Sequence, residues 1–197
     1  FYDVFQVSTD DWVVALGDVQ GKGAEAAAVT ALARYTVRAA SVDHDSPSDV
    51  LHILDRVLHQ AETDRFCTVV LVRLRRVEGE WCATVACGGH PLPLLRRPGR
   101  HPVPVGEHGA LLGALPGATF TDTEVTLDHG DALVLYTDGV TEGRRLGHFY
   151  GTSRLVAVVD EHRGAAADVT DAILADVMTY QSGNARDDIA VVTVAVS

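Results

Sequence analysis

Hydrophobic residues in this chain form short continuous runs and a few longer segments of helical spacing. Four runs are rich in β-branched residues with little polar alternation, the pattern of strands covered on both faces; they span residues 13–16, 68–74, 132–136 and 189–196. We expect these to be central strands. Shorter runs joined by turns, such as Glu78-Gly79-Glu80 and Asp128-His129-Gly130, indicate hairpins and antiparallel pairing; they span residues 4–7, 81–87, 92–96 and 123–127.

Three segments place apolar residues at helical spacing. Residues 24–40 add an alanine run, which favours a helix. Ser46-Pro47-Ser48-Asp49 resembles a capping box with proline at the first helical position, and the amphipathic pattern continues to Ala61. The third segment is 167–180. The order of strand pair, helix pair, strand group, helix and strand predicts an α+β fold; residues 97–109 and 143–150 are expected to be loops, the second a flap over an acidic corner.

Composition limits the function classes. The chain has 197 residues, 47% of them hydrophobic, enough for one large core, so we expect a single domain over residues 1–197. It opens on Phe1 rather than Met, which favours a piece of a longer protein. A formal charge of −11 without a basic stripe argues against a nucleic-acid partner. No apolar run approaches the roughly 20 residues that span a bilayer. Three cysteines without metal-ligand spacing are expected to be reduced and structural, which predicts a cytoplasmic protein.

Acidic corners at strand ends carry the chemistry. They are Gly17-Asp18-Val19, Thr137-Asp138-Gly139 and Arg186-Asp187-Asp188. One Asp-Gly pair is more often a simple turn. Three such corners at strand ends would converge on one edge of antiparallel sheets. Carboxylates clustered there would repel one another unless a hard cation lay between them. Oxygen ligands suit Mg²⁺ or Mn²⁺ better than zinc, and a two-metal site can activate water against a phosphate ester.

A glycine-rich segment follows the first corner. Residues 17–23 lack the spacing and the final Ser or Thr of a nucleotide-binding P-loop. Gly21 and Gly23 either let the backbone approach a phosphate at a helix N-terminus or only permit a tight turn. Lys22 either contacts that phosphate or is solvated. This loop is therefore the candidate substrate-binding segment.

Taken in order, five motifs resemble the SpoIIE/RsbU-like bacterial branch of the metal-dependent (PPM, type 2C) protein serine/threonine phosphatases. They are Phe1-Tyr2-Asp3, Gly17-Asp18-Val19-Gln20-Gly21-Lys22-Gly23, Gly88-Gly89-His90-Pro91, Tyr136-Thr137-Asp138-Gly139-Val140-Thr141-Glu142 and Asp187-Asp188-Ile189-Ala190. The resemblance spans the chain. It implies a four-layer α-β-β-α sandwich, with two antiparallel sheets packed face to face and helices outside, and a centre of two Mn²⁺ or Mg²⁺ ions.

The resemblance also assigns roles to residues. It makes Asp18 the ligand that bridges both ions and the Val19 carbonyl a further ligand. Asp138 and Asp187 would hold one ion through their carboxylates, with the adjacent Asp188 as the reserve candidate. These aspartates are the implied catalytic residues, because a water activated by the ions would attack the phosphorus directly.

Two departures from the family pattern matter. The family usually has Gly-Gly-Asp before a segment like Phe1-Tyr2-Asp3, and the metal-site Asp of that motif is absent from this sequence, which predicts weaker metal binding or lower activity. Eukaryotic relatives carry a His where this chain has Gln20. We expect His90 to be structural, Glu142 to be a loop residue, and Asp3 to be either a support of the site or a strand-end polar residue.

The resemblance implies a phosphatase that acts on a phosphorylated regulatory protein, an anti-anti-sigma factor of the STAS type. In the family, helical segments upstream of this domain can form a homodimer. The alternative is a catalytically silent module that binds the same kind of partner. The retained aspartates argue against it, because a module freed from catalysis gains stability by losing clustered carboxylates. A hydrolase of small phosphoesters is a third reading, which would need a deeper apolar pocket.

Overall fold

The computed structural model describes residues 1–61, 63–183 and 187–197. Its contacts divide the chain into two compact units. Unit 1 comprises residues 1–92 and 106–126, and unit 2 comprises residues 93–105 and 127–197. Both units combine antiparallel strands with helices, so the predicted α+β class is confirmed. The single domain over residues 1–197 stays a prediction. No helix in the described ranges is long and apolar enough to cross a membrane.

Unit 1 is built on a five-stranded sheet in the order β1-β2-β3-β4-β7. Its strands are β1 (Tyr2–Ser8), β2 (Asp11–Val19), β3 (Cys67–Val77), β4 (Glu80–Gly88) and β7 (Thr123–Leu127). Strands β1 to β4 pair antiparallel with their neighbours. The hairpin predicted at Glu78-Gly79 is confirmed, since Val77 pairs with Glu80 across these two residues.

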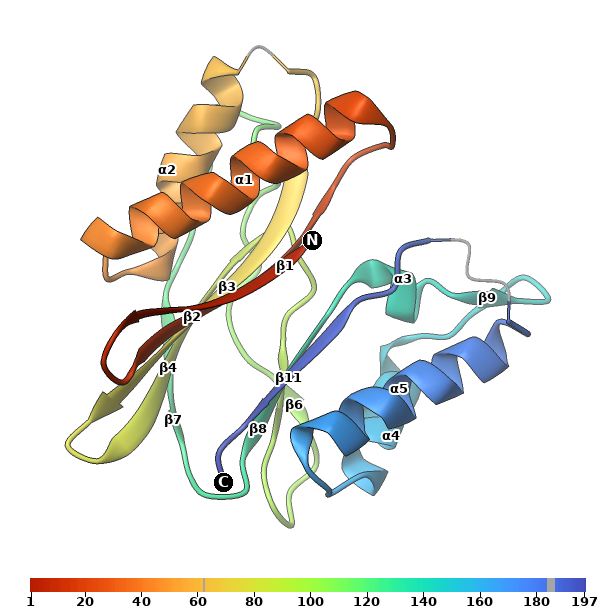
Figure 1. Ribbon diagram of the computed structural model, residues 1–197. Coiled ribbons are helices and arrows are strands. Elements are labelled where there is room, and N and C mark those ends of the chain that lie inside the picture. Colours follow the sequence, from red (N-terminus) through yellow and green to blue (C-terminus); the bar gives the residue numbers. More distant parts are fainter. Residues whose placement is uncertain (62, 184–186) are drawn as a thin grey trace. The chain divides into compact units, whose positions relative to one another are not determined.

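Two helices, α1 (Ala24–Asp43) and α2 (Pro47–Gln60), lie side by side over this sheet (Figure 1). Odd-numbered residues of β2 and β3 face them, and Val13, Ala15 and Leu71 are buried in the same core as the helices. The predicted cap of α2 is confirmed, because the Ser46 hydroxyl accepts a hydrogen bond from the Asp49 amide. Even-numbered residues of these strands project from the opposite face.

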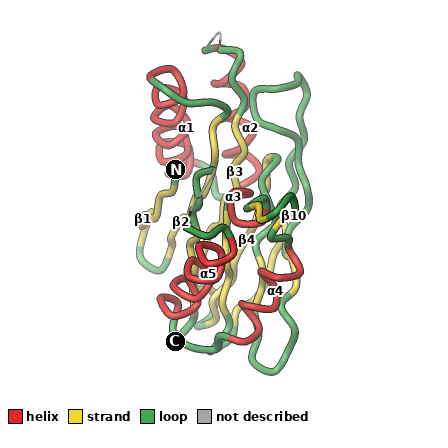
Figure 2. Tube along the Cα trace, turned by 90° about the vertical axis from the view of Figure 1, so that its right-hand side faces the viewer, coloured by secondary structure: helices red, strands yellow, loops and turns green. Residues whose placement is uncertain are grey.

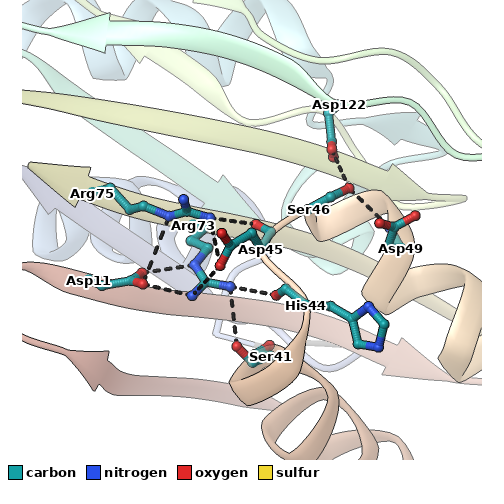
Figure 3. A network of polar contacts seen from close by, with 9 residues as sticks. All are labelled: Asp11, Ser41, His44, Asp45, Ser46, Asp49, Arg73, Arg75 and Asp122. Atoms are coloured by element: carbon teal, nitrogen blue, oxygen red, sulfur yellow. Dashed lines mark hydrogen bonds and ion pairs between the residues drawn. The ribbon is translucent and has the colours of Figure 1, made fainter. Parts of the chain in front are cut away.

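A buried arginine anchors the α1–α2 connection to the sheet (Figure 3). The Arg73 side chain on β3 is only 4% exposed and donates two hydrogen bonds, of 2.7 and 2.8 Å, to the Asp11 carboxylate. It also donates to the backbone carbonyls of Ser41 and His44. Because these partners come from the start of β2 and the end of α1, one side chain fixes how α1 leaves the sheet.

Unit 2 contains a four-stranded antiparallel sheet in the order β11-β8-β5-β6. Its strands are β5 (Leu94–Arg96), β6 (Val103–Pro104), β8 (Ala132–Tyr136) and β11 (Val191–Ala195), and its helices are α3 (Asp138–Thr141), α4 (Thr152–Glu161) and α5 (Ala166–Tyr180). A separate pair, β9 (Arg144–Arg145) and β10 (His148–Phe149), forms a short hairpin. Apolar residues of α4 and α5 pack on Val134 and Tyr136 of β8.

Three expectations are corrected here. The last strand is not central: β11 is the edge of its sheet and its residues are only half-buried. The turn at Asp128-His129-Gly130 joins no hairpin, because β7 pairs in one sheet and β8 in the other. Neither expected loop is merely a loop, since residues 97–109 contain β6 and residues 143–150 contain the β9–β10 hairpin.

Candidate functional site

Asp18 lies near the end of β2, where the sequence predicts a ligand, and is half-exposed. Its register partner on β3 is Thr68, so the two side chains project side by side from the face opposite α1 and α2. Thr68 shares a 2.9 Å hydrogen bond with Nδ1 of His90, whose side chain is 2% exposed. A buried imidazole thus fixes the neighbour of Asp18.

The Val19 carbonyl faces away from β3. Cys67, the register partner of Val19, uses both its amide and its carbonyl to pair with Leu112, so these groups point away from β2. Val19 therefore lies at a non-hydrogen-bonded position toward β3, and its own backbone groups point to the other side. Gly17, two residues earlier, uses that same side to exchange two hydrogen bonds with Phe1.

The glycine-rich loop turns directly from β2 into α1. Gly21 and Gly23 have φ of 90° and 92°, a left-handed conformation that glycine adopts without strain. A Cβ at Gly21 would lie 2.1 Å from Nη1 of Arg65. Arg65 donates to the Gln20 carbonyl at 2.7 Å and pairs with Glu25 at 2.9 Å. The turn conformation therefore favours glycine at both positions, whatever else the loop contacts.

An open groove of about 760 Å³ lies beside this loop. Its lining combines polar residues of the loop and of the segment before β3 with apolar residues of α1 and the end of α2: Gln20, Gly21, Glu25, Ala28, Val29, Leu32, Ala61, Thr63, Asp64 and Arg65. Lys22 is exposed and does not line it.

In unit 2, a buried threonine joins the Asp138 corner to the Asp187-Asp188 corner. Thr137 is 3% exposed, and its hydroxyl donates to the Asp188 carbonyl and accepts from the Ala190 amide, each at 3.0 Å. Its own amide donates to the Ala190 carbonyl. Three hydrogen bonds therefore hold the segment before β11 against the start of α3.

Close packing at Gly139 completes this contact. A Cβ there would lie 2.4 Å from the Asp188 carbonyl oxygen, so only glycine allows the approach. The Asp187 carboxylate accepts a hydrogen bond from the next amide at 2.9 Å. No described residue donates to or pairs with the carboxylate of the half-buried Asp138. Arg186, which begins the third corner, lies outside the described residues.

Asp3, Glu142 and Gln20 are the remaining residues that the sequence analysis discussed. Asp3 is buried, and its carboxylate accepts hydrogen bonds from Arg34 and Arg38 of α1, mainly the latter, which hold its pKa below the ordinary value. It therefore ties β1 to α1. Glu142 is exposed at the end of α3, and Gln20 is exposed in the glycine-rich loop.

The predicted ligands are divided between the units: Asp18 and Val19 in unit 1, Asp138, Asp187 and Asp188 in unit 2. Among described residues, no three His, Cys, Asp or Glu side chains form a group that could hold a metal. The donor chemistry nevertheless fits a hard cation, because Asp138 has no basic partner in the described ranges and the Val19 carbonyl faces away from β3.

Sequence reasoning gave no role to Thr137 or Arg65. Both have a local signal: Thr137 is a polar residue directly after the fully buried β8, and Arg65 is a charged residue two positions before β3, which is mostly buried. Their partners lie about 50 residues away in sequence, at separations of 51 for Thr137 and Asp188 and 45 for Arg65 and Gln20. Periodicity cannot reveal such pairs.

Most of this chain matches a known protein family and two known proteins. The family model described as Stage II sporulation protein E (SpoIIE) matches residues 8–197. Protein IcfG of Synechocystis sp. is 26% identical over 98% of this chain and 35% of its own length. Phosphoserine phosphatase RsbU of Bacillus subtilis is 26% identical over 89% of this chain and 52% of its own. This chain thus spans about a third to a half of these relatives.

A solved structure agrees in fold. The crystal structure of the RsbU and RsbW domains of Rv1364c from Mycobacterium tuberculosis superposes with a TM-score of 0.82 and 26% identity, over 98% of this chain and 53% of that one. The family model covers residues 8–197, and the two relatives and this structure each match most of the chain. The chain belongs to the SpoIIE family, within the RsbU-like branch of the PPM (type 2C) phosphatases.

Proposed function

We propose that this chain is a metal-dependent protein serine/threonine phosphatase that acts on a phosphorylated regulatory protein, an anti-anti-sigma factor of the STAS type. The observation that carries the proposal is the joining of Asp138 to the Asp187-Asp188 corner by Thr137. Hydrogen bonds from a buried threonine and a close glycine contact hold the backbone of one acidic corner against the other, although like charges on their side chains repel. Such an arrangement favours a cation-binding role over a simple turn.

Asp18, the Val19 carbonyl, Asp138 and Asp187 would ligate two Mn²⁺ or Mg²⁺ ions, with Asp188 in reserve. When bound, the ions would supply an activated water and neutralise charge on the phosphoryl oxygens. Neighbouring residues of the chain position the aspartates. Thr68 lies opposite Asp18 on the neighbouring strand and limits where the Asp18 carboxylate can point. Thr137 holds the backbone of the segment that carries Asp187.

Gly21, Lys22 and Gly23 would contact the substrate near its phosphate, because α1 begins at Ala24 and its first amides have no side-chain cap. Arg65 holds this loop through the Gln20 carbonyl. We expect Lys22 to supply charge and the glycines to supply close backbone approach.

The test is phosphate release from a phosphoserine peptide with and without Mn²⁺. Asp18→Asn and Asp138→Asn should each reduce Mn²⁺-dependent release to a small residual rate, whereas Asp43→Asn, at an exposed aspartate at the end of α1, should leave release unchanged. No release by a folded wild-type chain with Mn²⁺ present would favour the silent binding module. Release from p-nitrophenyl phosphate alone would favour a hydrolase of small phosphoesters.

An extended chain sharpens the test. Phe1 exchanges hydrogen bonds of 2.7 and 2.9 Å with Gly17, so a residue joined before Phe1 in the same register would lie opposite Asp18. We expect Gly-Gly-Asp added before Phe1 to raise Mn²⁺-dependent release. Gly-Gly-Asn is the matched control and should not.

A further inference from the structure

The tip of the β9–β10 hairpin carries a leucine that the fold does not need. Arg145 pairs with His148, and the two residues between them, Leu146 and Gly147, have φ of 49° and 86°. This is the left-handed turn that favours Asn or Gly at its first position. Leu146 is 92% exposed, so its side chain gains nothing from the core. Neither turn geometry nor burial accounts for leucine here.

The hairpin is held firmly at its base. The Tyr180 hydroxyl on α5 lies 3.2 and 3.0 Å from the carbonyl oxygens of His148 and Phe149, and these two oxygens share its single O–H donor. The guanidinium of Arg144 stacks 4.4 Å from the centre of the Phe149 ring, and the Tyr150 amide donates to the Gly143 carbonyl at 2.7 Å. These contacts fix the base of the hairpin, while the tip is exposed to solvent.

The hairpin also carries local positive charge in an acidic chain. Arg144 and Arg145 are exposed, and the net charge of the whole chain is −11. The hairpin follows the helix that begins at Asp138. Figure 1 places β9 near α3, and the tube in Figure 2 places β10 beside it. The carboxylates of that region repel an anionic phosphoprotein, and two arginines offset this repulsion where the partner approaches.

We propose that the β9–β10 hairpin is a docking element for the protein substrate. Leu146 enters an apolar depression on the partner, and Arg144 and Arg145 contact acidic residues around it. The partner is a serine-phosphorylated protein with a mixed acidic and apolar surface, so the proposal rests on the proposed function. An exposed apolar anchor with a charged rim is the usual arrangement of a binding hot spot.

The test measures binding and turnover separately. The probes are two fluorescent phosphoserine peptides of equal length, one with acidic and leucine flanks and one with lysine and leucine flanks, together with p-nitrophenyl phosphate. Wild type should bind the acidic peptide about tenfold more tightly than the lysine peptide. Arg144→Gln with Arg145→Gln should remove most of that preference.

The variant Leu146→Asn separates docking from stability. Asparagine suits the turn better than leucine, so the melting temperature should stay equal or rise. Binding of the acidic peptide should weaken about fivefold, with turnover of p-nitrophenyl phosphate unchanged. The matched controls are Leu115→Asn, which removes a leucine that is 68% exposed in unit 1, and Arg100→Gln on an exposed loop; both should leave peptide binding intact.

The outcomes distinguish the two proposals. Peptide binding that is unaffected by the hairpin variants, or equal losses on peptide and p-nitrophenyl phosphate, would overturn docking while leaving the phosphatase in place. A wild-type preference for the lysine peptide would also overturn it. Hairpin-dependent binding without any Mn²⁺-dependent turnover would support docking and contradict the phosphatase.

Discussion

The hydroxyl of Thr137 is expected to hold the two acidic corners of unit 2 together, and Thr137→Val removes it with almost no change in shape. The substitution deletes two 3.0 Å hydrogen bonds, one to the Asp188 carbonyl and one from the Ala190 amide. Asp188 is exposed, so water can replace the first partner, but the Ala190 amide is half-buried and would lack its partner. Together these losses should lower the free energy of unfolding by about 2 kcal/mol.

The assay is urea unfolding followed by circular dichroism, with Thr137→Ser as the control because serine keeps the hydroxyl. Thr137→Val should also speed hydrogen exchange at the Ala190 amide more than at other amides. General destabilisation would not single out this amide. If the corner positions a metal ligand, Mn²⁺ affinity measured by calorimetry should fall in Thr137→Val and be retained in Thr137→Ser. Equal stability and equal exchange in both variants would refute the reasoning.

Three further predictions follow from packing and charge. Gly139→Ala places a Cβ 2.4 Å from a backbone carbonyl oxygen, so it should lower the melting temperature and Mn²⁺ affinity together, and unchanged values of both would contradict the close contact. Arg73→Met removes two hydrogen bonds to the buried Asp11 carboxylate and leaves it the longer 3.8 Å contact with Arg75, so it should cost about 3 kcal/mol in urea unfolding, much of it recovered when Asp11→Leu is added. A loss below about 1 kcal/mol would show that the two hydrogen bonds contribute little to stability. Hydrogen bonds from Arg154 lower the pKa of Asp176 in the folded state. The ionised carboxylate therefore stabilises the fold when the pH is above the pKa of about 4 that Asp176 has in the unfolded chain. This stabilisation is lost as the pH falls through the lower pKa of the folded state. Asp176→Asn should therefore be less stable than wild type at pH 7, with a smaller gap at pH 3 in the same assay, and a gap that does not change with pH would exclude the charge as its cause.

Local pattern predicted much of the fold. The run at 132–136 is β8 with the expected boundaries, and Ser46 caps α2 through the Asp49 amide as its motif indicates. Helix α4 was not predicted, because it has only ten residues and three buried ones, among them Leu155 and Val159. The sequence also did not predict that β7 and β8 belong to different sheets. A three-residue turn has the same sequence pattern whether the strands on either side of it pair or separate.

The site was predictable as a set of residues but not as a set of contacts. Asp18 and Asp138 stand out because each comes just after an apolar run in the sequence, and the family resemblance places both in known motifs. The Thr137 contact with the segment before β11, and the Arg65 contact with the Gln20 carbonyl, depend on chain segments brought together only by folding. The resemblance names candidate ligands, whereas these contacts fix the chain segments beside them.

The measurement that most directly tests the central claim is a double-mutant cycle of Mn²⁺-dependent phosphate release, using Asp18→Asn, Asp138→Asn and the two combined. Residues that serve one centre are strongly non-additive, so the double variant should be no less active than the more damaged single variant. If the two losses instead multiply, or if either single variant keeps wild-type release, Asp18 and Asp138 do not act in one metal centre and the phosphatase mechanism proposed for this chain is wrong.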